Sequence, residues 1–152
     1  MKYKNIITNI AIAVLCFKLL RNLLCYVLVS NQVLPEGNTI PYNVNFIEFL
    51  YPTVTFAVTM ILARFLIERP TIYARNLFIF IQAIVIFYIG CFIRLEWVAS
   101  LDAPALVQQV NGFFMAIQFI NIMLSFRLIY LAYLIERDSR LASNTETGNL
   151  NG

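Results

Sequence analysis

Apolar residues gather along this chain in four long stretches that are separated by short polar segments with prolines and glycines. The stretches cover residues 6–29, 46–67, 76–97 and 111–135. Each one is long enough to cross a bilayer, which takes about 20 helical residues. The pattern therefore predicts an all-α integral membrane protein, a four-transmembrane-helix bundle with short loops, within residues 1–140.

The composition supports a membrane protein and leaves only a polar tail outside the helices. Of the 152 residues, 61% are hydrophobic and 12% are charged, whereas soluble domains carry about 25% charged residues. Residues 141–152 are polar and show no hydrophobic periodicity. We expect this segment to be a disordered cytoplasmic tail, because it has too few apolar residues to bury.

Basic residues flank only one side of the four predicted spans. The two connections on the opposite side, residues 30–45 and 98–105, contain no Lys or Arg. Positively charged segments stay in the cytoplasm as a rule, so both termini are predicted to be cytoplasmic and the membrane to be the plasma (inner) membrane. The basic residues that carry this prediction are Lys2, Lys4, Arg69, Arg75, Arg137 and Arg140.

The first span contains two cations, Lys18 and Arg21, in the middle of its apolar sequence. A charged side chain at the centre of a membrane helix costs about 2.5–3.5 kcal/mol on insertion scales, so its presence needs a physical reason. Residues three and four apart share a helix face, which places Lys18, Arg21 and Asn22 on one polar face. Polar residues of the second and fourth spans also cluster by face, which predicts that these faces meet inside the protein.

Because each helical residue rises 1.5 Å, the depths of these polar residues in the membrane can be compared between the spans. Lys18 is expected near the level of Thr59 and Gln118, and Arg21 closer to the outside. Glu48 is the only carboxylate on this polar face and is the expected counter-ion of Arg21. Two interpretations stay open. The structural one is pairing within the membrane among Arg21, Glu48, Thr55, Thr59 and Asn121; the functional one is a site for an anion or a lipid headgroup at Lys18, Arg21, Asn22 and Gln118.

The remaining charges of the third span are expected at its outer edge. Arg94 and Glu96 lie beside Trp97, a residue type that is enriched at the membrane–water interface. We therefore expect both charged side chains to reach outward to the lipid headgroups.

Several classes of chemistry have no support in the sequence. Histidine is absent, which removes the usual general base and most ligands for haem and transition metals. The three cysteines form no CxxC pair, and no nucleotide-binding, hydrolase or metalloprotease motif occurs. The basic residues form no patch of the kind that binds nucleic acid. We expect neither an enzyme nor a cofactor, a metal site or a nucleic-acid partner.

Three functions stay open from the sequence. The first is a non-enzymatic accessory, assembly or scaffold subunit of a membrane complex, which is favoured by the short loops and the large apolar faces. The alternative is a small oligomeric transporter or channel with a cationic site for an anionic solute or lipid. The third is a membrane enzyme that acts on lipids. The expected partners are the lipid bilayer and either another membrane protein or further copies of this chain.

Overall fold

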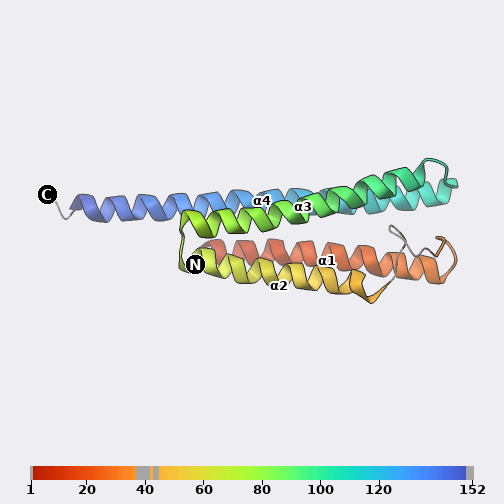
Figure 1. The fold of residues 1–152 in the computed structure, drawn as a ribbon, viewed down its shortest axis with the longest axis horizontal. Coiled ribbons are helices and arrows are strands. Elements are labelled where there is room, and N and C mark those ends of the chain that lie inside the picture. The colour runs from red at the N-terminus through yellow and green to blue at the C-terminus, as the bar shows by residue number, and fades with distance from the viewer. Residues whose placement is uncertain (1, 37–41, 43–44, 150–152) are drawn as a thin grey trace.

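The computed structural model describes residues 2–36, 42 and 45–149, with the side chains of residues 3–36, 42 and 45–143. Four helices make up this part of the chain (Figure 1): α1 Lys2–Ser30, α2 Phe46–Glu68, α3 Ile72–Ser100 and α4 Ala105–Asn149. Each predicted span lies inside one helix. All four helices are long and apolar enough to cross a membrane, so the prediction of an all-helical chain with four such helices is confirmed.

Consecutive helices run antiparallel, with α1 beside α2 and α3 beside α4 (Figure 1). Contacts also join α2 to α3 and α4 to α1. The start of α1, the connection between α2 and α3 and the end of α4 lie at one end of the molecule, which we call the terminal end. The connections from α1 to α2 and from α3 to α4 lie at the opposite end, which we call the loop end.

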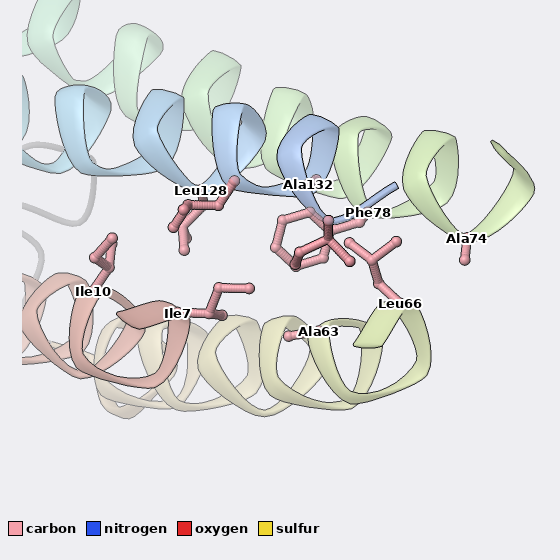
Figure 2. Close-up of a cluster of buried hydrophobic side chains, with 10 residues drawn as sticks. Ile7, Ile10, Ala63, Leu66, Ala74, Phe78, Leu128 and Ala132 are labelled. Atoms are coloured by element: carbon pink, nitrogen blue, oxygen red, sulfur yellow. The ribbon is translucent and has the colours of Figure 1, made fainter. Parts of the chain in front are cut away.

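The interior has an apolar cluster at each end and polar residues between them. The terminal cluster (Figure 2) includes Ala63, Ala74 and Ala132, small residues that let membrane helices approach closely. The loop-end cluster includes Cys25, Val29, Val107 and Phe114. Buried polar residues lie between the clusters, and we call them the polar layer: Lys18, Arg21, Asn22, Thr59, Gln82, Gln118, Asn121 and Ser125.

Ion pairs hold α3 against α4 beyond the terminal cluster. Arg75 Nη1 lies 3.1 Å from Glu136 Oε2, and Arg140 also pairs with Glu136, one turn earlier in its own helix. The hydroxyl of Tyr3 donates a hydrogen bond to Asp138 and so joins α1 to this region. These contacts fix the relative positions of three helices at the terminal end.

Helix α4 is longer than the sequence predicted. It has 45 residues and ends at Asn149, whereas the disordered tail was expected to begin at residue 141. Once a helix has formed, each added residue gains a backbone hydrogen bond and fixes only its own dihedral angles, so a long helix can continue into a polar segment. Residues 150–152 of the predicted tail lie outside the described residues.

Candidate functional site

Lys18 brings a buried cation into the polar layer. Its side chain is 7% exposed, and its ammonium nitrogen has no hydrogen-bond acceptor within the described part of the chain. The nitrogen lies 5.2 Å from the centre of the Tyr51 ring. A cation–π contact of this kind attracts the charge, but it leaves the three N–H donors of an ammonium group without acceptors.

Lys18 lies between two small cavities. The first, of about 30 Å³, lies toward the loop end, and we call it the loop-side cavity. The second, of about 20 Å³, is the terminal-side cavity, which Thr55, Thr59 and Gln82 help to line. Lys18 and Pro52 line both cavities. A cavity needs a volume of at least about 10–15 Å³ to hold one water molecule. Each of the two cavities therefore has room for one or two molecules of that size.

The loop-side cavity brings together the four residues that the sequence predicted for an anion site. Lys18, Arg21, Asn22 and Gln118 all line it. The wall is completed by Glu48 and by aromatic side chains, of which Tyr51 and Tyr88 stack with ring centres 4.1 Å apart. The side-chain oxygen of Gln118 is buried and has no hydrogen-bond partner within the described residues. The cavity wall therefore contains both an unsatisfied donor and an unsatisfied acceptor.

Arg21 pairs with Glu96, and not with Glu48 as the sequence predicted. Its Nε and Nη2 atoms lie 3.1 and 2.7 Å from Glu96 Oε1. Arg21 is 2% exposed and Glu96 is 0% exposed, and the guanidinium also lies 5.2 Å from the centre of the Phe114 ring. Glu48 is half-buried in the cavity wall and forms no ion pair among the described residues. The prediction failed because Glu96 was expected at the outer edge of its span.

The spacing along α3 explains why Glu96 faces inward. Glu96 ends a row of buried positions that starts at Ala74 and includes Gln82 and Phe92. Glu96 follows Gln82 by 14 residues, which is close to four turns of 3.6 residues, so both side chains leave the helix on the same side. Gln82 is a polar residue within an apolar span, so a count of turns from Gln82 would have placed Glu96 on the inner face. The position of Glu96 beside Trp97 suggested the interface instead.

Pro52 creates a polar contact between α1 and α2. A proline inside a helix has no N–H, so the carbonyl four residues earlier lacks its usual partner. In α2 this carbonyl belongs to Glu48, and it accepts a hydrogen bond from the side-chain amide of Asn22 on α1. Asn22 therefore satisfies a backbone group that Pro52 leaves unpaired, directly beside the loop-side cavity.

The other residues of the predicted pairing network have separate environments. Thr59 accepts a hydrogen bond from Gln82 Nε2 at 3.1 Å, which links α2 to α3. The hydroxyl of Thr55 donates to the carbonyl of Pro52 in its own helix at 3.0 Å. Asn121 is completely buried, and neither polar atom of its side chain has a hydrogen-bond partner within the described residues. The same is true of the hydroxyl of Ser125, one turn further along α4.

No protein-family model, curated protein or solved structure matches this chain. The geometry of the polar layer is therefore the basis for a functional proposal.

Proposed function

We propose that this chain is an integral membrane protein that binds a small inorganic anion at Lys18 and works as a small transporter or channel. The four helices would form a transmembrane bundle with the bound anion near its middle. The observation that carries this proposal is the buried ammonium group of Lys18, which has no acceptor within the described residues and lies between two cavities.

The arrangement of the helices supports an orientation with both termini in the cytoplasm. The terminal end holds the start of α1, the α2–α3 connection and the end of α4 (Figure 1). These are the segments that contain the basic residues Lys2, Lys4, Arg69, Arg75, Arg137 and Arg140. Since basic flanks stay on the cytoplasmic side, we propose that the terminal end faces the cytoplasm of a plasma (inner) membrane.

The unsatisfied N–H donors of Lys18 support an anionic ligand. Arg21 is balanced by Glu96, whereas the Lys18 nitrogen has no hydrogen-bond acceptor within the described residues and contacts the Tyr51 ring. Glu48 lines the same cavity but forms no ion pair within this part of the chain. Isolated charges are costly inside a membrane, and intramembrane ionisable residues commonly mark ion or substrate pathways. An anion beside Lys18 would accept the free N–H donors and neutralise the charge.

The size of the cavities supports a small ligand. At about 30 and 20 Å³, the two cavities match an ion of roughly the size of a water molecule. A lipid headgroup would need a larger space. Of the anionic ligands that the sequence left open, the geometry therefore favours a halide-sized inorganic ion.

Chloride efflux from reconstituted vesicles tests this function. Vesicles of purified protein are loaded with potassium chloride, and efflux is measured with a chloride electrode after valinomycin is added. We expect efflux above that of protein-free vesicles and a loss of about tenfold or more in Lys18→Met, because hydrogen bonds to charged groups contribute about 1.5–3 kcal/mol. Methionine has a long unbranched side chain that fills similar space without the charge.

Arg127→Met is the matched control. Arg127 is an exposed cation of α4 that lines neither cavity, so its loss should leave efflux unchanged. Wild-type efflux equal to that of protein-free vesicles, or equal rates in wild-type protein and Lys18→Met, would refute the proposal. An equal decrease in both variants would show that overall charge, and not the polar layer, controls the flux.

A non-enzymatic accessory or scaffold subunit is the second candidate, and one surface feature favours it. Tyr73, Phe80 and Phe87 follow one another at intervals of seven residues along α3, and Phe87 is 75% exposed. Residues at this interval form a continuous stripe along a helix, which suits a helix of a membrane-protein partner. Purification of a tagged copy in mild detergent should then recover a partner in fixed stoichiometry, which Phe80→Ala/Phe87→Ala should lose; recovery of this chain alone would refute it.

A further inference from the structure

A cavity much larger than the two beside Lys18 lies away from the polar layer, as a groove between α1 and α2 at the terminal end. Its volume is about 610 Å³, within the range of about 300–1,000 Å³ that is typical of small-molecule sites. Helix α1 contributes Lys4, Ile7 and Thr8, and α2 contributes residues between Met60 and Glu68. No residue of the groove also lines the loop-side or terminal-side cavity.

The chemistry of the groove changes with depth along the two helices. Its charged residues, Lys4, Arg64 and Glu68, belong to the helical turns nearest the terminal end. One to two turns further in, the wall is formed chiefly by Ile7, Met60 and Ile61. A polar entrance followed by an apolar channel matches a lipid molecule, which has a headgroup at the interface and an acyl chain below it.

The charge at the entrance is positive. Lys4 and Arg64 give two positive charges and Glu68 gives one negative charge, which leaves a net charge of +1. Arg64 Nε donates to Glu68 Oε1 at 2.7 Å, but the Arg64 side chain is 80% exposed. Exposed ion pairs of this kind contribute at most about 1 kcal/mol, so Glu68 does not prevent Arg64 from binding a stronger anion such as a phosphate.

We propose that this groove binds an anionic phospholipid, with its phosphate between Lys4 and Arg64. One acyl chain lies along Met60 and Ile61. In the proposed orientation the groove opens to the cytoplasmic leaflet, where anionic lipids attract basic side chains. The site is separate from Lys18, so the lipid and the small anion are two different ligands.

Lipid retention measured by native mass spectrometry tests this site. The protein is purified in mild detergent with an equimolar mixture of phosphatidylglycerol and phosphatidylcholine, and the bound lipids are counted. We expect wild-type protein to retain one phosphatidylglycerol in preference to phosphatidylcholine. In Lys4→Gln/Arg64→Gln this preference should fall by about tenfold or more, because each basic residue near an anionic membrane surface contributes to attraction.

Two further variants separate the groove from general surface charge. Arg69→Gln/Arg127→Gln removes the same charge from exposed residues that do not line the groove, and it should retain the lipid. Thr8→Phe narrows the groove without changing its charge, and it should lower the retention of phosphatidylglycerol.

The outcomes decide the proposal in both directions. Loss of the lipid preference in the groove variants alone supports it. Three results would overturn it. The first is equal retention of the two lipids by wild-type protein, and the second is an equal loss of preference in the Arg69→Gln/Arg127→Gln control. The third is a lipid-free dimer of the wild-type protein that disappears in Thr8→Phe. The last result would show that a second copy of the chain occupies the groove. Chloride efflux in Lys4→Gln/Arg64→Gln should remain at the wild-type rate, which keeps this test separate from the test of Lys18.

Discussion

The buried ion pair between Arg21 and Glu96 gives the strongest prediction about stability. We propose to replace Glu96 by methionine, which removes the carboxylate from a fully buried position. The partner Arg21 is itself 2% exposed and donates two hydrogen bonds, at 3.1 and 2.7 Å, to the oxygen Oε1 that the substitution removes. The substitution therefore leaves a guanidinium inside the protein without its carboxylate.

The expected loss is large for a single substitution. Removing one member of a buried ion pair costs about 3–5 kcal/mol, because the remaining charge stays buried without compensation. Glu96→Gln keeps a neutral acceptor at the same place, so its loss should be smaller, at about half of that value. The double variant Arg21→Met/Glu96→Met removes both charges, and it should recover most of the stability that either single variant loses.

Unfolding in mixed micelles with increasing sodium dodecyl sulfate measures these differences. Helix loss is followed by circular dichroism. The fluorescence of Trp97 gives a second measurement, because it is the only tryptophan and follows Glu96 directly in the chain. Coincident transitions in the two measurements are the condition for reading the shifts as free energies of unfolding.

Glu48→Gln is the matched control, because Glu48 lies in the same cavity wall and forms no ion pair within the described residues. We expect it to change the unfolding free energy by less than about 1 kcal/mol, as for most substitutions outside buried networks. A loss in Glu48→Gln as large as that in Glu96→Gln would show that Glu48 is the true counter-ion. Additive losses in the double variant would refute a direct pair between Arg21 and Glu96.

Two further substitutions test contacts between the helices. Gln82→Leu removes the hydrogen bond to Thr59 and should lower the unfolding free energy by about 1 kcal/mol, as for polar contacts in other membrane proteins; an unchanged transition would contradict it. Glu136→Gln weakens the pairs with Arg75 and Arg140, and it should speed amide hydrogen exchange at the terminal ends of α3 and α4; unchanged protection in both would contradict it.

The helices could be predicted from the sequence because each one follows a single physical requirement. A segment inside a bilayer must satisfy its own backbone hydrogen bonds and present apolar side chains. The four long apolar stretches of the sequence show this requirement directly. The sequence also identified the residues around the loop-side cavity, since Lys18, Asn22 and Gln118 are polar in an apolar context. Counting helical rise was enough to place Lys18 and Gln118 at a similar depth, with Asn22 about one turn away.

The partner of Arg21 could not be chosen from depth alone. Glu48 and Glu96 both lie toward the loop end, and the choice depends on which way each side chain turns and on how α1 packs against its neighbours. The groove between α1 and α2 was also missed, because residues of two different helices form it together. The sequence of one helix alone does not predict such a space.

The contact between Asn22 and the carbonyl that Pro52 leaves unpaired restricts how α1 and α2 can move relative to each other. Sliding or rotation of α2 along α1 would break this hydrogen bond and leave a bare carbonyl in a nonpolar environment, which costs several kcal/mol. Bending α2 at Pro52 keeps the bond while it changes the space on both sides of Lys18. We therefore expect bending of α2 at Pro52 to be the movement that this contact restricts least.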